Sequence, residues 1–180
     1  MNTTKDKILV TGAAGFLGSH LSEKLAKMGY EVIGIDNMIG GYKDNVPKNI
    51  TFHNIDCCDL KKIQNIMKGI NVVYHCAATA HEGLSVFSPY EITKNNYLAS
   101  VSIFSAAVNE KVKRIIFCSS MARYGDQNSP FSETMKPKPV DPYAISKVAS
   151  EDVLKNLCEL NGIEWVIAVP HNIIGPRQKY

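Results

Sequence analysis

The sequence lacks the features that mark several large classes of protein. No stretch is long and apolar enough to span a membrane, and the N-terminus carries no apolar run of the signal-peptide kind, so we expect no membrane partner. No block of Lys or Arg occurs, and a formal net charge of +3 is too small to indicate a nucleic-acid partner. Internal repeats and low-complexity segments are missing as well.

Cysteine and histidine are present but are not spaced as metal ligands. The histidines include no H-x-x-x-H pair, so we expect no metal site. The cysteines are odd in number and match no zinc-binding pattern, which favours reduced thiols in the cytoplasm. They are Cys57, Cys58, Cys76, Cys118 and Cys158.

What the sequence does contain is typical of one globular domain. Hydrophobic residues make up 45% of it and charged residues 21%, both usual values. At 180 residues the chain is long enough to bury a sizeable core. We therefore treat residues 1–180 as a single folding unit.

Apolar, strand-like runs alternate with amphipathic stretches along this unit. The expected strands cover residues 8–10, 31–35, 49–55, 72–77, 114–119 and 164–169, and the expected helices cover 17–28, 60–68, 89–110 and 142–160. Six strands joined by crossover helices predict a doubly wound parallel sheet of the α/β class, which is Rossmann-like. Residues 125–142 are rich in proline and predict a long loop.

A glycine-rich turn follows the first expected strand. The stretch from Lys7 to Gly18 reads KILVTGAAGFLG, and Gly12, Gly15 and Gly18 give the spacing G-x-x-G-x-x-G, a relative of the dinucleotide fingerprint. In that interpretation one glycine permits the tight turn, one admits a pyrophosphate to bare backbone, and one lets helix and strand pack closely. Because turns collect glycine anyway, the spacing alone also fits a plain strand–turn–helix connection.

An acidic residue at the end of the second expected strand favours the dinucleotide interpretation. Asp36 follows Gly18 by 18 residues, close to the distance at which an acidic side chain meets the adenosine ribose hydroxyls. A carboxylate there would repel a 2′-phosphate, so the sequence predicts NAD rather than NADP. The alternative is a solvated aspartate at a strand end.

Tyr143 and Lys147 form the pattern Y-x-x-x-K at the start of an expected helix. Residues four apart face the same side of a helix. Since a nearby lysine favours the phenolate, we predict that Lys147 lowers the pKa of Tyr143 from about 10 toward neutral pH. Tyr143 is then a candidate general base for an alcohol, and Ser120 is its candidate hydrogen-bond partner. Without the glycine turn, an exposed surface pair would explain the pattern equally well.

Taken together, the motifs resemble those of the extended short-chain dehydrogenase/reductases, specifically the nucleotide-sugar epimerases and dehydratases. The matching motifs are TGAAGFLG (11–18), ID (35–36), VVYHCAA (72–78), NNYLAS (95–100), CSSMARYG (118–125), YAISK (143–147) and HNIIGPRQ (171–178). The resemblance covers essentially the whole chain.

This resemblance implies an NAD cofactor and assigns further residues to it. Phe16 and Leu17 would lie beside the pyrophosphate, and Asp36 with Asn37 would lie at the adenosine ribose. The other implied cofactor contacts are Asp56 and Cys57 at the adenine, Cys76, Ala77 and Ala78 after the fourth strand, Asn96, Pro170, and the pair Tyr143 and Lys147.

The resemblance also implies a nucleotide-sugar substrate, for which we expect a UDP-sugar. Ser120, Tyr143 and Lys147 would be the catalytic residues, with Ser120 and Tyr143 touching the reacting sugar and Asn172 the sugar nucleotide. His81 and Glu82 lie where substrate-binding loops run in the family, although a plain surface loop explains them as well.

One departure from the family pattern bears on the reaction. Met121 and Ala122 stand where the dehydratases carry an Asp-Glu pair and the decarboxylases a glutamate, which disfavours both reactions. Epimerisation at carbon 4 through a transient 4-keto sugar needs only reversible hydride transfer and remains the expectation. The alternatives are a one-way keto-sugar or other reductase of the superfamily, and an NAD-binding module without catalysis.

The second departure concerns length and assembly. Family members continue into a smaller C-terminal substrate domain that this sequence lacks, so residues 1–180 would form the NAD-binding domain and about 171–180 would begin the connection. The resemblance further implies a homodimer through the two long helices. Their apolar positions, which serve equally well against the sheet, are Val101, Phe104, Val108, Val148, Val153 and Leu157.

Overall fold

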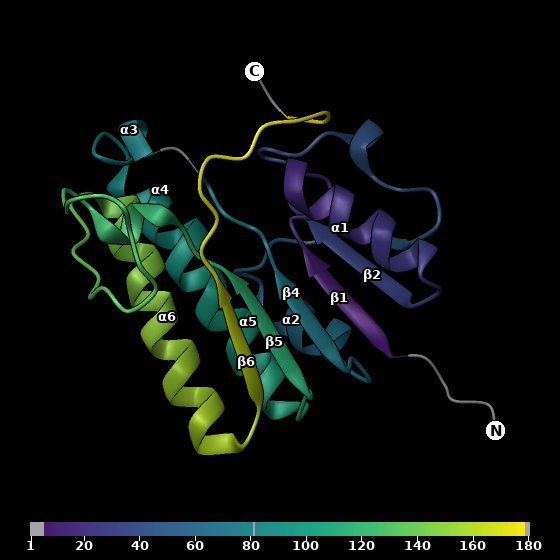
Figure 1. The fold of residues 1–180 in the computed structure, drawn as a ribbon. Coiled ribbons are helices and arrows are strands. Elements are labelled where there is room, and N and C mark those ends of the chain that lie inside the picture. Colours follow the sequence, from purple (N-terminus) through teal and green to yellow (C-terminus); the bar gives the residue numbers. More distant parts are fainter. Residues whose placement is uncertain (1–5, 81, 179–180) are drawn as a thin grey trace.

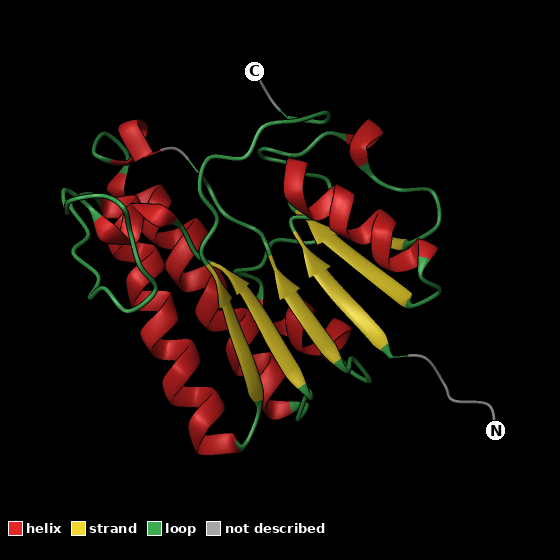
Figure 2. Cartoon of the chain, in the orientation of Figure 1, coloured by secondary structure: helices red, strands yellow, loops and turns green. Residues whose placement is uncertain are grey.

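The computed structural model describes residues 6–80 and 82–178, and in them six strands form one parallel sheet (Figures 1 and 2). The strand order is β3-β2-β1-β4-β5-β6. The strands are β1 (Lys7–Thr11), β2 (Glu31–Asp36), β3 (Thr51–Asn54), β4 (Val72–His75), β5 (Arg114–Cys118) and β6 (Glu164–Ala168). The order reverses between β1 and β4, which confirms the doubly wound sheet and places its switch point at these two strands.

Helices cover both faces of the sheet, as a parallel sheet requires. They are α1 (Phe16–Lys27), α2 (Leu60–Met67), α3 (Glu82–Ser85), α4 (Pro89–Ile92), α5 (Ala99–Asn109) and α6 (Pro142–Asn161), with short turns η1 (Lys43–Asn45) and η3 (Met121–Tyr124). Alternate residues of each strand point to opposite faces. Leu9 therefore packs in the core under α2, α5 and α6, whereas its neighbours Ile8 and Val10 pack toward Leu25 of α1.

The predicted helix over 89–110 forms, but it is not uniform. A π-helical segment, η2 (Thr93–Leu98), separates α4 from α5. Such segments widen a helix by about one residue per turn and are frequent at functional sites. The buried side chain of Asn96 lies in this widened turn. The period of the apolar residues does not distinguish the two helix types, which is why the sequence predicted one continuous helix.

Helix and strand ends differ from the predicted ends by no more than two residues. Two of the helices are followed by a glycine in the left-handed conformation. Gly29 and Gly162 follow α1 and α6 with φ of 85° and 66°, the left-handed region that other residues seldom adopt. The predicted loop over 125–142 contains no regular element before Pro142 begins α6.

Phe104 is one of the apolar positions that could serve either a dimer or the sheet, and it packs on the sheet. Phe104 is fully buried within the molecule, edge-on to the rings of His75 and Phe117 with centroids 5.6 Å from each. It faces the sheet and is not available to a second subunit. The other positions named for this role, Val101, Val108, Val148, Val153 and Leu157, are half-buried.

Candidate active site

The glycine-rich turn leaves no space for side chains at two of its three glycines. Gly12 has φ of 72°, and a Cβ there would lie 2.9 Å from the backbone nitrogen of Ala77. A Cβ on Gly18 would lie 2.1 Å from the carbonyl oxygen of Gly12. Gly15 is the N-cap of α1. The turn thus presents bare backbone at a helix N-terminus, the arrangement that binds a phosphate.

Asp36 lies beside this turn, at the carboxyl end of β2. Its carboxylate is largely buried and accepts hydrogen bonds from the backbone nitrogens of Ala14 (3.1 Å) and Met38 (2.8 Å). These bonds fix the carboxylate next to the glycine turn. The structure therefore places Asp36 at the carboxyl edge of the sheet, beside that turn.

Asn37 and Asp56 lie together at the ends of β2 and β3. The Asn37 amide donates to Asp56 (3.3 Å), and the backbone nitrogen of Cys58 donates to the same carboxylate (2.8 Å). Burial alone would raise the pKa of Asp56, but the bonds from Cys58 and Asn37 outweigh it and lower that pKa. Cys57 is buried in the core, and burial raises the pKa of its thiol.

The sequence did not single out Thr11 and His75, which join β1 to β4 at the switch point. The Thr11 hydroxyl accepts from the backbone nitrogens of Cys76 (3.1 Å) and Ala77 (3.0 Å). It lies 2.7 Å from Nδ1 of His75. Since its lone pairs are engaged, Thr11 donates to Nδ1, and the loop that begins at Cys76 is anchored to β1.

The chain of hydrogen bonds continues from His75 into the π-helical segment. Nε2 of His75 lies 2.9 Å from the Ser100 hydroxyl, which itself donates to the carbonyl oxygen of Asn96 (2.6 Å). His75 is therefore a neutral imidazole that carries its proton on Nε2. Burial, with a smaller effect of Lys147, lowers its pKa to about 3.

Asn96 ties the loop after β4 to α6. Its side-chain oxygen accepts from the backbone nitrogen of Thr79 (2.7 Å), and its amide donates to the hydroxyl of Ser146 (3.3 Å). Ala78 is in the loop that Asn96 holds. Asn96 thus holds the backbone of this loop at Thr79 and the side chain of Ser146 on α6.

Tyr143, Lys147 and Ser120 come together at the carboxyl ends of β4 and β5, and all three are buried. Lys147 Nζ lies 5.9 Å from the centroid of the Tyr143 ring and donates to the carbonyl oxygen of Cys118 (2.8 Å). Ser120 ends the connection from β5, where its hydroxyl caps η3 and is hydrogen-bonded to Tyr143. The three side chains predicted to be catalytic therefore share one site.

The predicted effect of Lys147 on the phenol is wrong for the protein's own groups. Burial raises the pKa of Tyr143, and the hydrogen bond from Ser120 offsets only part of that rise. The charges of Glu82 and Asp141 raise it further. Lys147 does not compensate, because it bonds to a backbone carbonyl rather than to the phenol, and burial lowers its own pKa.

Glu82 belongs to the short helix α3, which packs on the start of α6. The Ser85 hydroxyl, also in α3, bonds to the carbonyl oxygen of Glu82 (2.6 Å) and to the carboxylate of Asp141 (3.4 Å), the N-cap of α6. The charge of Glu82 therefore acts on Tyr143, although its side chain is exposed. His81, its predicted partner, lies outside the described residues.

Residues 170–178, here called the C-terminal segment, run from β6 back across the carboxyl edge of the sheet to α1 (Figure 1). The carbonyl oxygen of Pro170 accepts from the backbone nitrogen of Met121 (3.2 Å). At the far end, Gly175 packs against the ring of Phe16, where a Cβ would lie 3.3 Å from the ring. Asn172 is exposed on this segment.

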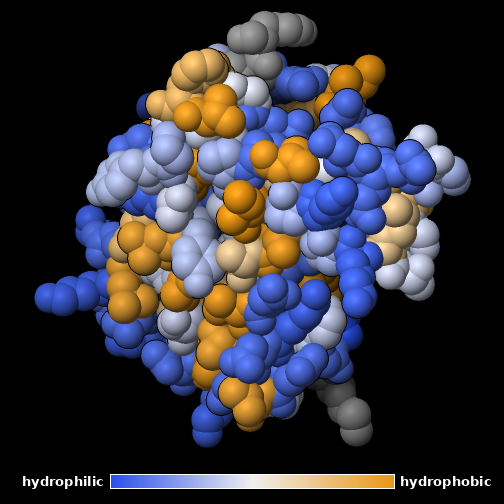
Figure 3. All heavy atoms as spheres, turned by 90° about the vertical axis from the view of Figure 1, so that its left-hand side faces the viewer, coloured by the Kyte–Doolittle hydropathy of each residue, from blue (hydrophilic) through white to orange (hydrophobic). Residues whose placement is uncertain are grey.

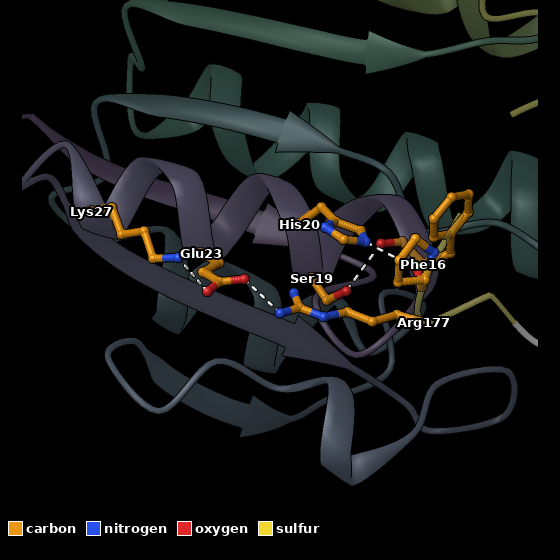
Figure 4. Close-up of polar contacts among 7 residues, drawn as sticks. Phe16, Ser19, His20, Glu23, Lys27 and Arg177 are labelled. Atoms are coloured by element: carbon orange, nitrogen blue, oxygen red, sulfur yellow. Dashed lines mark hydrogen bonds and ion pairs between the residues drawn. The ribbon is translucent and has the colours of Figure 1, made fainter. Parts of the chain in front are cut away.

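Polar contacts fasten the end of this segment to α1 (Figure 4). His20 Nε2 lies 2.9 Å from the carbonyl oxygen of Pro176, and Arg177 forms a 2.5 Å ion pair with Glu23. Hydrogen bonds from Lys27 and Arg177 lower the pKa of Glu23 to about 2. The amide of Asn45 donates to the carbonyl oxygens of both Ala14 (3.2 Å) and Arg177 (3.1 Å), so the segment, the glycine turn and η1 are linked. The sequence contained no pattern that pointed to this contact.

Within residues 6–80 and 82–178, no group of three His, Cys, Asp or Glu side chains is placed to hold a metal ion. No helix in that part of the chain is both long and apolar enough to cross a membrane.

The fold and the site together define a class of protein. A doubly wound sheet with a glycine turn, a carboxylate after β2 and a buried Tyr-Lys-Ser group at the switch point is a dinucleotide-binding domain with groups suited to acid–base chemistry on an alcohol. The particular family follows from comparison. The chain belongs to the NAD dependent epimerase/dehydratase family, whose sequence profile matches residues 8–180.

Relatives of known name or structure agree with this assignment. A putative UDP-glucose 4-epimerase of Methanocaldococcus jannaschii is 37% identical over 174 residues, which cover 95% of this chain and 57% of that protein. The crystal structure of UDP-glucose 4-epimerase with UDP-glucose from Thermotoga maritima superposes with a TM-score of 0.93 at 34% identity, covering 96% of this chain and 58% of that one. The UDP-glucose 4-epimerase of Thermus thermophilus in complex with NAD gives a TM-score of 0.92 at 35% identity, covering 96% and 57%. The chain therefore spans just over half the length of these relatives.

Proposed function

We propose that this chain is the cofactor-binding and catalytic part of an NAD-dependent nucleotide-sugar epimerase that acts at carbon 4 of a UDP-sugar. The observation that carries the proposal is the buried group of Tyr143, Lys147 and Ser120 beside a glycine turn that leaves no space for side chains. The similarity to UDP-glucose 4-epimerases supports the choice of substrate class.

The turn and its neighbours fit NAD. A Cβ at Gly12 would clash with the backbone of Ala77 and one at Gly18 with the backbone of Gly12, so the turn is a close-packed cradle of backbone at a helix N-terminus, which suits a pyrophosphate. Gly15, Phe16 and Leu17 begin the helix that would face the phosphates. The remaining proposed contacts are Asp36 and Asn37 at the ribose, Asp56 and Cys57 at the adenine, and Cys76, Ala77, Ala78, Asn96, Tyr143, Lys147 and Pro170 along the nicotinamide half. Bound NAD would supply the hydride acceptor and later the hydride donor.

The protein's own groups would handle the proton. Tyr143 would take it from the 4-hydroxyl of the sugar and return it after the keto sugar has turned over, while Ser120 hydrogen-bonds the reacting oxygen. Lys147 would hold the nicotinamide ribose. Since burial raises the pKa of Tyr143 above its ordinary value of about 10, bringing that pKa to neutral pH means a fall of more than ~3 units, which corresponds to more than roughly 4 kcal/mol. The positive charge of the oxidised cofactor would therefore have to act on the phenol.

The residues that follow Ser120 argue against the other reactions of the family. Met121 and Ala122 begin η3 and carry no carboxylate for removing water or carbon dioxide. Asn172 of the C-terminal segment is the proposed contact to the sugar nucleotide, together with Glu82 and His81. The proton and hydride are both returned to the sugar, so the proposed reaction is redox-neutral.

The test is a panel of nucleotide sugars offered to the full-length protein, with product stereochemistry read by NMR. We expect inversion at carbon 4 of a UDP-sugar without net consumption of added NADH. Steady consumption of NADH would instead identify a one-way reductase, and NAD binding without turnover would identify a non-catalytic module.

Tyr143→Phe is the matched variant, because it removes only the phenolic oxygen. We expect a loss of about 10²- to 10⁴-fold in turnover, the usual contribution of a general acid–base, with NAD affinity little changed. Full turnover by this variant would rule out the mechanism.

Domain role, assembly and location complete the proposal. We propose that residues 1–180 form the NAD-binding domain, with about 171–180 beginning the connection to a substrate domain, and that the protein works in the cytoplasm, where the five free thiols stay reduced. A homodimer through the surface formed by η2, α5 and α6 is supported by exposed apolar side chains there, Leu98 (51% exposed) and Ile145 (54% exposed). Figure 3 shows apolar side chains gathered across the side of the molecule where α6 lies.

A further inference from the structure

Glu151 is a buried carboxylate that the proposed reaction does not use. It lies in the middle of α6, and none of its surface is exposed. Burying a carboxylate costs several kcal/mol unless partners replace the lost water. A carboxylate at this depth therefore needs polar or charged partners around it.

Three side chains surround this carboxylate. The Ser119 hydroxyl donates to Oε1 at 2.5 Å, and Nη2 of Arg123 lies 3.1 Å from Oε2. Arg123 is itself about nine-tenths buried, so this ion pair is largely removed from water. Lys155, at the edge of the group, lies 3.8 Å from Oε2. Within the described residues, Nε of Arg123 and Oε2 of Glu151 make no hydrogen bond of good geometry, so the group is held by charge as much as by hydrogen bonds.

The partners of Glu151 connect it to all the proposed catalytic residues. Ser119 directly precedes Ser120, and Arg123 lies in η3, which Ser120 caps. Lys147 lies one helical turn before Glu151 on α6, the spacing at which two side chains share a face. Glu151 is therefore bound to the segment that carries Ser120. It also lies on the same face of α6 as Lys147, one turn further along the helix.

We propose that Glu151 is a positioning residue for the epimerisation, fixing Ser120 against α6 through Ser119 and Arg123 and providing the counter-charge of Lys147. The inference rests on the proposed function, because it assigns Glu151 a role in the same site. Arg123 takes part as the ion-pair partner of the buried carboxylate.

The charges around Lys147 support the second half of this role. The titratable groups that face it are Tyr143 and Glu151 on α6, Cys118 on β5, and His75 and Cys76 at the end of β4. Burial raises the pKa of Cys76 to about 12 and raises that of Cys118, so both thiols are neutral at neutral pH. His75 is neutral too, since its pKa is about 3. Cys118, Cys76 and Glu151 oppose the lowering of the Lys147 pKa by burial, and because both thiols are neutral at neutral pH, Glu151 is the carboxylate among the three.

The decisive variants are Glu151→Gln and the double variant Glu151→Gln with Arg123→Met. The single variant keeps an oxygen for Ser119 but leaves the guanidinium of Arg123 buried without its anion, so it is expected to lower stability. The double variant removes both charges and is expected to recover most of that stability. Asp152→Asn is the matched control, because Asp152 is the next residue on α6 but is exposed.

In both variants kcat is expected to fall about tenfold or more, with KM little changed. Loss of the Glu151 anion lowers the pKa of Lys147, and the ammonium form of Lys147 is the active one. The alkaline limb of the kcat profile should therefore begin to fall at a lower pH than in the wild type. We expect this alkaline limb to move down by about one pH unit. A double variant with recovered stability, wild-type kcat and an unmoved limb would show that Glu151 is merely structural and would overturn the proposal.

Two further measurements keep the proposal testable if those variants fold poorly or if turnover is absent. Ser119→Ala removes a hydrogen bond but no charge, so it should lower kcat and leave the alkaline limb in place; wild-type kcat would contradict the positioning of Ser120. The pKa of Lys147, followed by NMR of labelled lysine in the NAD-bound protein, needs no turnover. A fall of that pKa in the Glu151→Gln variant, in a protein inert toward every sugar, would sink the proposed function and leave the electrostatic role standing.

Discussion

At the scale of single residues, two glycines with similar positive φ allow two effects of an added side chain to be compared. One is the strain of the left-handed backbone conformation, and the other is a steric clash with neighbouring atoms. Gly12 and Gly69 have φ of 72° and 75°. A Cβ on Gly12 would meet the backbone of Ala77 at 2.9 Å, whereas a Cβ on Gly69 would have nothing within 4 Å. Alanine at either position costs about 1 kcal/mol or somewhat more for the left-handed conformation.

We therefore expect Gly69→Ala to lower stability by that amount and to leave NAD affinity unchanged. Gly12→Ala should cost more, because the loop after β4 must also move, and should weaken NAD binding by at least about tenfold. Thermal unfolding and calorimetric titration with NAD measure the two effects. Equal losses of stability with unchanged affinity in both variants would show that the turn does not shape the cofactor site.

His75 gives stability a dependence on acid pH. Because burial lowers its folded-state pKa from the ordinary value of 6.5 to about 3, the folded protein binds this proton less well than the unfolded chain does. The stabilisation from neutral His75 is complete above about pH 6.5 and is lost as the pH falls toward 3. His75→Gln should show a weaker loss of stability across that window in denaturant titrations. His53→Gln, a change at an exposed position on β3, is the control and should follow the wild type.

At the scale of elements, the contact between the C-terminal segment and α1 rests on a pair that can be removed with a matched control. Glu23 binds Arg177 of the segment at 2.5 Å and Lys27 of its own helix at 2.6 Å. Arg177→Met removes the first contact and Lys27→Met the second. Because the segment crosses beside Phe16 and the glycine turn, we expect the first variant to release NAD several-fold faster and the second to release it at the wild-type rate.

Stopped-flow displacement of NAD measures both rates. Equal release rates in the two variants would show that the ion pair does not retain the cofactor.

The elements also show how far the sequence could predict the structure. The doubly wound parallel sheet and the positions of Asp36, Tyr143 and Ser120 followed from local patterns, since apolar runs mark strands and their carboxyl ends meet at one edge. The pKa of Tyr143 could not follow from spacing. A separation of four residues places Lys147 on the right face but says nothing of the carbonyl oxygen of Cys118 to which it bonds, or of the depth of burial. The partners of Arg177 and Glu151 were hidden for the same reason, because they lie 154 and 32 residues away in sequence.

At the scale of the whole molecule, helices α5 and α6 carry apolar residues both on the face that packs on the sheet and on the outer face. Their inner faces pack on the sheet through Phe104 and Leu154, which are fully buried. Their outer faces keep half-buried Val101 and Val148, flanked by the exposed Leu98 and Ile145. Since apolar residues occur on both faces, the helical period does not tell the sheet side from the outer side. That is why the sequence left the surface of Phe104 open.

The outer face leads to a prediction about assembly. If two copies pair through this surface, a carboxylate at its centre must be buried without a partner, which costs several kcal/mol. Ile145→Asp should therefore shift the protein toward monomer by about tenfold or more in the dissociation constant, as measured by analytical ultracentrifugation. Ile39→Asp is the control, because Ile39 is equally apolar and more exposed, at 64%, but follows β2 on another part of the molecule. A protein that is dimeric in both variants would place the interface elsewhere, and one that is monomeric without any change would remove the dimer from the proposal. Since Tyr143 lies two residues from Ile145 on α6, the comparison should be made at protein concentrations that bracket the dissociation constant, so that loss of pairing and a direct effect on turnover are told apart.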